Sequence, residues 1–210
     1  DTDLEINVPV GNDYQIDIKY NPENTDYKGM TYTVNNKSIL TVSDTGLITP
    51  LTVGDTTITI TSTRNKSLTK TVTVHVINPK IETDTYVINR DTEGSEYITG
   101  MEPYTTVEDF LNNLKNDRDT VNVYEKTETE IVSIDDIVKT RYIVKLSING
   151  TVYDQLVLVV KGDINGDGYI TVADINKSKN EISGKIEFNE IEKAATDINI
   201  DTYNTVADIN

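Results

Sequence analysis

Apolar and polar residues alternate, with short turn signals between them, through the first 79 positions of the chain. From Tyr14 to Tyr20 every second residue is apolar and the residues between are polar, which predicts a strand with one buried face. The same period recurs in four further segments: 31–34, 39–42, 56–61 and 69–77. Many short strands in so few residues, separated by turns, predict a β-sandwich.

Residues 36–49 and 53–60 carry a family resemblance. The first segment reads Asn-Lys-Ser-Ile-Leu-Thr-Val-Ser-Asp-Thr-Gly-Leu-Ile-Thr, and the second reads Val-Gly-Asp-Thr-Thr-Ile-Thr-Ile. A glycine at the first turn and another before the next strand, here Gly46 and Gly54, recur in bacterial immunoglobulin-like domains of group 2. Most of residues 1–79 resembles that family, which implies an N-terminal Ig-like β-sandwich.

A second block begins after Asn78-Pro79, because proline cannot continue a central strand. Thr105 and Glu108 have the spacing of a capping box and predict a short helix from there. Strands are expected before this helix and after it, and the last two are joined across Asn149-Gly150, a strong hairpin signal. Residues 80–161 are therefore expected to form a small α+β domain.

A twelve-residue acidic loop begins at Asp163, directly after the last predicted strand. Oxygen-bearing residues stand at its positions 1, 3, 5, 7, 9 and 12, the spacing with which a loop wraps a calcium ion. Gly168 permits the sharp turn at position 6, and position 12 is Asp where Glu is usual, so the backbone must come closer to the ion. The predicted ligands are Asp163, Asn165, Asp167, Tyr169 through its backbone carbonyl, Thr171 and Asp174.

The loop is repeated 34 residues later, since residues 197–210 match residues 163–176 at eleven of fourteen positions. Such similarity indicates a duplication. In the second copy Thr202 replaces the position-6 glycine, at a cost of about 1 kcal/mol or more for a strained backbone, and Asn204 replaces the apolar Ile170. We expect two Ca²⁺ ions with the first site stronger, or alternatively a decayed second repeat that binds nothing. The predicted second-site ligands are Asp197, Asn199, Asp201, Tyr203, Thr205 and Asp208.

The sequence after the first loop favours a helix at 175–182, and a second helix at 187–196 leads into the second loop. This order, and the opening Gly162-Asp-Ile-Asn-Gly-Asp-Gly168, resembles a type I dockerin over residues 162–210. Residues 80–161 in turn resemble the small spacer that often precedes a dockerin in Firmicute extracellular proteins. The expected fold class is mainly β and multidomain: an N-terminal Ig-like β-sandwich, a small α+β domain and a C-terminal α-helical dockerin-like module of paired EF-hand-type calcium loops.

The dockerin resemblance implies a protein partner, a cohesin-type domain. In that family, loop positions 10 and 11 and residues one turn into the exit helix contact the cohesin. By this resemblance the partner-binding residues are Val172, Ala173, Lys179, Asn180, Val206 and Ala207. The alternative is that the small apolar residues among them pack within the module.

Charge and composition limit the classes of partner that the chain could bind. A formal net charge of −16 argues against nucleic-acid binding, and the absence of cysteine excludes disulfides and thiolate zinc sites. No apolar run approaches the roughly 20 residues of a membrane span. We expect an extracellular or cell-surface bacterial location, with no nucleic-acid partner.

No catalytic constellation is recognisable, so we expect a non-enzyme. His75, the single histidine, is expected on the polar face of a strand. A charged loop, rather than the carboxylate pair of a glycosidase, is the interpretation for Glu125, Glu128 and Glu130. The leading hypothesis is a non-catalytic C-terminal region anchored to a cohesin partner in a calcium-dependent way. The alternative is a stalk, adhesin or filament subunit that calcium stiffens or joins, including by self-association. Carbohydrate binding by the tyrosines is a weaker third reading.

Overall fold

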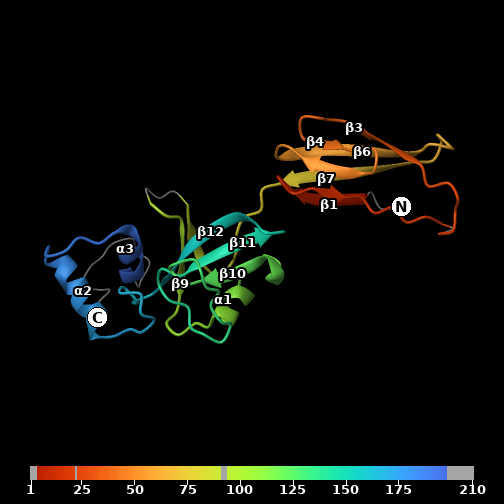
Figure 1. The fold of residues 1–210 in the computed structure, drawn as a ribbon. Helices are drawn as coiled ribbons and strands as arrows, with labels where there is room; N and C mark the ends of the chain where they lie inside the picture. Colours follow the sequence, from red (N-terminus) through yellow and green to blue (C-terminus); the bar gives the residue numbers. More distant parts are fainter. Residues whose placement is uncertain (1–3, 22, 91–93, 198–210) are drawn as a thin grey trace. The chain divides into compact units, whose positions relative to one another are not determined.

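A computed structural model describes residues 4–21, 23–90 and 94–197. The chain divides into two compact units, Asp1–Pro79 and Lys80–Asn210 (Figure 1). Each unit has its own hydrophobic core. The division of the second unit at residue 161 into a spacer and a calcium module stays a prediction.

The first unit consists of two sheets that enclose one core. The larger sheet has the strand order β1-β7-β6-β3, with β1 parallel to β7, and the smaller has the order β2-β5-β4. Leu40 and Ile48 of the smaller sheet are fully buried together with Val8, Ile58 and Val74 of the larger. The strands are β1 (Leu4–Pro9), β2 (Tyr14–Gln15), β3 (Met30–Val34), β4 (Leu40–Val42), β5 (Leu47–Pro50), β6 (Gly54–Ser62) and β7 (Thr69–Ile77).

Period-two patterning explains these strands. In β7 the three valines at alternate positions from Val72 are buried, while His75 between them lies on the other face and meets Asp55 at 2.7 Å. The strand expected from Tyr14 to Tyr20 is confined to β2, and this prediction was wrong in length. Its partner β5 begins at Leu47, so residues beyond Ile16 have no neighbouring strand with which to pair.

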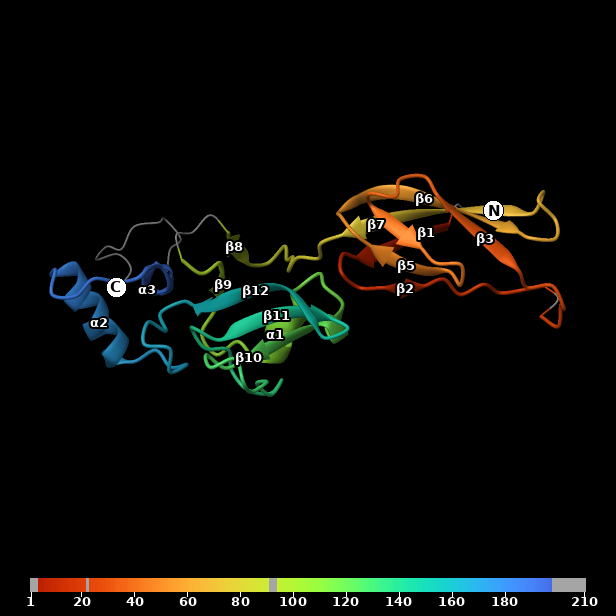
Figure 2. The ribbon, with the colours of Figure 1, turned by 45° about the horizontal axis from the view of Figure 1, so that its top comes forward.

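The second unit is built on a five-stranded sheet in the order β10-β11-β12-β9-β8. Only β9 and β12 pair in parallel, and β11 and β12 are joined across Asn149-Gly150, both with positive φ. Helix α1 (Val107–Asn112) covers one face of the sheet with Phe110 and Leu111 (Figure 2). The strands are β8 (Val87–Asn89), β9 (Tyr97–Met101), β10 (Val121–Tyr124), β11 (Ile143–Ile148) and β12 (Thr151–Val160), with a 3₁₀ turn at Arg118–Thr120.

The N-cap of α1 lies one residue later than predicted. The hydroxyl of Thr106 accepts a hydrogen bond from the amide of Asp109, whereas the Thr105 hydroxyl donates to the carbonyl of Glu102. Two adjacent threonines offer the same capping group, so spacing alone could not select between them.

The predicted fold class is wrong at its C-terminal end. The described residues form mostly strands and three α-helices, of which α2 (Val172–Ile182) follows the first loop and α3 (Glu190–Thr196) follows α2. No paired EF-hand module is found in this part of the chain. The apolar residues Phe188 and Ala195 are buried against Val159 of β12, so α3 completes the sheet unit rather than a separate helical module.

Candidate metal centre

The first acidic loop connects β12 to α2. Its first and last predicted ligands, Asp163 and Asp174, are 0% and 1% exposed. The neighbouring Ile164 is also buried, packed with Val159 and Phe188. The loop therefore begins inside the second unit, and its two terminal carboxylates are withdrawn from water.

Asp163 is held by backbone amides. Its Oδ1 accepts a hydrogen bond from the amide of Gly166 at 3.0 Å, and its Oδ2 accepts one from the amide of Thr140 at 2.9 Å. Burial raises the pKa of Asp163, the amides of Thr140, Gly168 and Gly166 act in the opposite direction, and the charge of Asp174 raises it further.

Asp174 closes the loop on its own start. Its Oδ1 accepts hydrogen bonds from the amides of Ile164 and Asn165 at 3.0 and 3.1 Å, and its Oδ2 accepts one from the amide of Thr171 at 3.0 Å. Thr171 and Asp174 also form the capping box of α2, in which the Thr171 hydroxyl accepts the amide of Ala173 at 3.1 Å. One carboxylate thus fixes the beginning of the helix and both ends of the loop.

The middle of the loop is more exposed and folds through side chain to backbone bonds. Asn165 Oδ1 accepts the amide of Asp167, and Asp167 Oδ1 accepts the amide of Tyr169, each at 2.8 Å. Tyr169 is 55% exposed. Gly166 and Gly168 both have positive φ, so the turn uses the freedom that glycine provides.

The donor set tests whether this loop suits a metal ion. Among the described residues, no ion pair joins Asp163 or Asp174 to a basic side chain, although the two carboxylates repel each other. Nor do His, Cys, Asp and Glu side chains gather there in groups of three or more that could hold a metal. An ion would therefore also need the amide oxygen of Asn165 and the carbonyl of Tyr169. This set is all oxygen, which fits calcium better than a softer metal.

The second predicted loop lies almost wholly outside the described residues. Asp197 alone is described, and it is the C-cap residue of α3, with its amide bonded to the carbonyl of Lys193 at 3.0 Å. The remaining predicted ligands and partner residues of that copy lie outside the described part of the chain: Asn199, Asp201, Tyr203, Thr205, Val206, Ala207 and Asp208.

The first-copy partner residues lie on α2. Val172 is 68% exposed, Ala173 and Lys179 are exposed, and Asn180 is partly exposed. Val172 and Lys179 are seven positions apart and therefore lie on one side of the helix. The alternative, that Val172 and Ala173 pack within the module, has no support in their exposure.

Four residues around the loop were missed by sequence reasoning. The amide of Thr140 binds Asp163, and the side chains of Arg141, Lys177 and Glu192 form a cluster beside Ile164. Thr140 precedes Asp163 by 23 residues, and no motif in a single sequence connects such positions.

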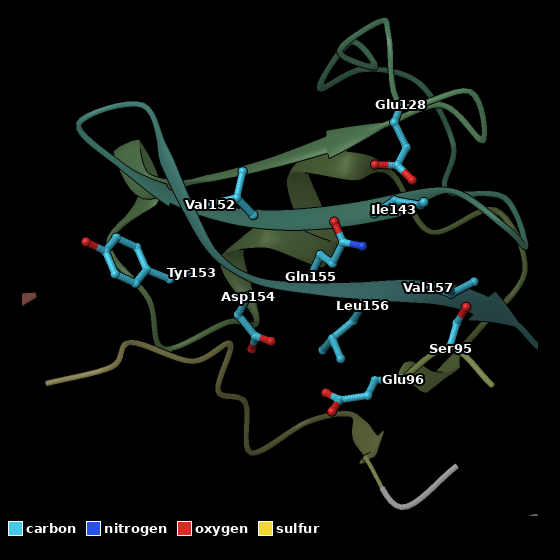
Figure 3. Close-up of a pocket in the computed structure, with 10 residues that line it drawn as sticks. All are labelled: Ser95, Glu96, Glu128, Ile143, Val152, Tyr153, Asp154, Gln155, Leu156 and Val157. Atoms are coloured by element: carbon cyan, nitrogen blue, oxygen red, sulfur yellow. The ribbon is translucent and has the colours of Figure 1, made fainter. Parts of the chain in front are cut away.

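A cavity of about 500 Å³ lies on the β11–β12 face of the second unit (Figure 3). Its three carboxylates are already paired: Glu128 with Lys145 at 2.6 Å, and both Asp154 and Glu96 with Arg90, at 2.6 and 2.5 Å. Figure 3 shows Glu96 and Glu128 on either side of the β11–β12 pair, not converging on one point. The acidic loop therefore remains the candidate site.

Known proteins share features with the first unit. Residues 2–72 match the family of bacterial Ig-like domains of group 2. The Ig-like match agrees with the two-sheet sandwich and with the positive φ of Gly46 and Gly54. No dockerin match accompanies it for residues 162–210.

Two solved structures are similar in part to the chain that carries this Ig-like domain. A GH10 xylanase containing a bacterial Ig-like domain, from termite gut, has 18% identity and a TM-score of 0.28, over 34% of this chain and 18% of that one. The S-layer protein rSbsC(31-844) has 16% identity and a TM-score of 0.29, over 76% of this chain and 24% of that one. The chain thus spans less than a quarter of either structure, and scores this low support no inference about function. No curated protein matches.

None of the helices in the part of the chain that the structure describes combines the length and the apolar character needed to cross a bilayer.

Proposed function

We propose that residues 163–174 bind one structural Ca²⁺ ion, and that the chain is a non-catalytic region of an extracellular or cell-surface bacterial protein. The observation that carries the proposal is the burial of Asp163 and Asp174 at the two ends of one twelve-residue loop. Two buried carboxylates without a basic partner are costly, because each loses hydration and each repels the other. A divalent cation bound between the two carboxylates would offset both the lost hydration and the repulsion.

The location rests on the Ig-like match and on charge. Residues 2–72 of the first unit match the bacterial Ig-like domains of group 2. The net charge of −16 suits a protein that holds cations. Millimolar calcium outside cells would keep even a weak loop filled, since extracellular calcium modules bind in the range of about 10⁻⁴ to 10⁻³ M.

Thermal unfolding with and without calcium tests this proposal. We expect calcium, added to chelator-treated protein at about 100 times its dissociation constant, to stabilise the second unit by about 2.7 kcal/mol. Asp163→Ala should abolish the response. Asp44→Ala, which removes an exposed carboxylate from a turn of the first unit, should keep it. An unchanged melting temperature for the unmodified protein, or an equal response in Asp163→Ala, would refute calcium binding at this loop.

Docking of a cohesin-type domain on α2 is a second candidate. The observation that favours it is the exposure of Val172 and Lys179 on one side of a helix that begins in the calcium loop. Calcium would order the first turn of that helix and so fix the docking surface. A stalk, adhesin or filament role, stiffened or joined by calcium, requires no cohesin.

A pull-down with an immobilised cohesin, with and without calcium, separates these two roles. Calcium-dependent capture that Val172→Asp abolishes supports docking. Val53→Asp is the matched control, because Val53 is 60% exposed in the first unit. Calcium-dependent self-association without capture supports the stalk or filament role instead.

A further inference from the structure

We propose that Thr140 and Arg141 are positioning residues of the calcium loop, so that a segment outside the loop sets its calcium affinity. The inference rests on the proposed calcium binding at residues 163–174. Both residues lie in the turn that precedes β11, more than 20 residues before the loop begins.

Thr140 is bonded to the chain at the start of the loop through both its backbone amide and its side-chain hydroxyl. Its amide donates to Asp163 Oδ2 at 2.9 Å, and its hydroxyl accepts the amide of Val160 at 3.0 Å. Thr140 itself is 2% exposed, so these bonds are shielded from competing water. The hydroxyl therefore ties the turn to the end of β12, while the amide orients the first predicted ligand.

Arg141 connects the loop to both helices. Its guanidinium donates to the carbonyl of Ile164 at 3.3 Å and to Glu192 Oε1 of α3 at 2.9 Å. Lys177 of α2 reaches the same two acceptors, Glu192 Oε1 at 2.7 Å and the Ile164 carbonyl at 3.4 Å. The Ile164 carbonyl, inside the loop, thus accepts hydrogen bonds from Arg141 and Lys177, and both of these side chains also bind Glu192.

The turn and the loop also pack closely. A Cβ added at Gly166 would lie 2.8 Å from the carbonyl oxygen of Thr140 and 3.0 Å from Arg141 Nη1. One added at Gly168 would lie 2.9 Å from Cγ of Lys139. The loop thus approaches the turn as nearly as glycine permits, and a movement of the turn would displace it.

The backbone of Arg141 is strained, with φ of 74°. A non-glycine residue in this region costs about 1 kcal/mol or more, and such strain persists only where surrounding contacts fix it. Here the amide of Arg141 donates to the carbonyl of Leu158 at 2.9 Å, which holds the turn against β12. The turn that carries Arg141 is thus held in one conformation by its contact with β12.

Calorimetric calcium titration of Arg141→Gly, in the full chain, tests the proposal. Glycine keeps the positive φ without strain and removes the whole side chain, so the aliphatic stem is lost together with the guanidinium. We expect calcium binding to weaken about 10-fold, as is typical when a group that orients a metal ligand is lost. Coulomb's law alone predicts the opposite, because removing a positive charge near a cation site strengthens binding. Weaker binding therefore reports lost positioning.

Lys145→Ala is the matched control, because Lys145 pairs with Glu128 and touches no loop residue. It should bind calcium as the unmodified protein does. If the unmodified protein binds calcium and Arg141→Gly binds equally well or better, the positioning role is refuted. If the unmodified protein fails to bind, calcium binding itself is refuted.

Two further readouts separate positioning from a purely structural role. If Arg141→Gly lowers the melting temperature equally with calcium and with chelator, Arg141 only stabilises the fold, and the proposal fails. In the unmodified protein, calcium should slow hydrogen exchange of the Thr140 amide more than that of the β10 amides. Equal slowing at both places would contradict the role of Thr140.

Discussion

Buried carboxylates are the residues on which the candidate site depends. The spacing from Asp163 to Asp174 could be read from the sequence, because a calcium loop is a local pattern. The contact between Asp163 and the amide of Thr140 could not, because it depends on where β11 and β12 bring the chain back. Local chemistry was predictable here, and the neighbours that tune it were not.

Glu192 is a residue at which stability and pH are linked. Its burial raises the pKa, but the bond from Lys177, the amide of Asn189 and the charge of Arg141 outweigh this and lower the pKa below the ordinary value. A lowered pKa in the folded state means that the stabilisation is present above the ordinary glutamate pKa. It is lost as the pH falls through the lowered value.

We therefore expect Glu192→Gln to reduce the free energy of unfolding by about 2 kcal/mol at neutral pH. The difference from the unmodified protein should shrink as the pH falls below the ordinary glutamate pKa, because Glu192 is protonated first in the unfolded chain and, at lower pH, in the folded one. Urea unfolding at neutral pH and at low pH, with chelator present, measures this. A difference that stays the same at low pH would contradict the role given to the Glu192 charge.

At the scale of elements, alternation predicted strands well and their ends poorly. β7 follows its valines at every second position, whereas β2 stops early because its antiparallel partner β5 begins only at Leu47. The C-terminal helices were expected, but α3 packs with Val159 instead of forming a paired helical module. Periodicity shows that a helix has an apolar side, and only the fold shows what that side meets.

The turn between β4 and β5 depends on Gly46. Gly46 has φ of 85°, and a Cβ there would lie 2.7 Å from the hydroxyl oxygen of Tyr32. Gly11 has a similar φ of 80° with no atom within 4 Å of the added carbon. Gly46→Ala should therefore destabilise the first unit by about 1 kcal/mol more than Gly11→Ala. Equal losses in urea unfolding would show that Tyr32 moves aside without cost.

On the scale of the whole molecule, the chain combines an Ig-like sandwich with a sheet unit that carries an acidic loop. The two units have separate cores, and the loop with its positioning residues belongs entirely to the second. We therefore expect calcium to act on the stability of the second unit and not on that of the first. The Ig-like family could be recognised from Gly46, Gly54 and the strands around them, because these turns are local.

Calorimetric titration shows whether residues 163–174 bind calcium. The intact chain should release or absorb heat on binding calcium, Asp163→Ala should lose the stronger site, and Asp197→Ala should keep it. A weaker second event, lost only in Asp197→Ala, would add the second predicted ion. An intact chain that gives no binding heat at any temperature tested, or an Asp163→Ala variant with unchanged affinity, would show that residues 163–174 do not bind calcium.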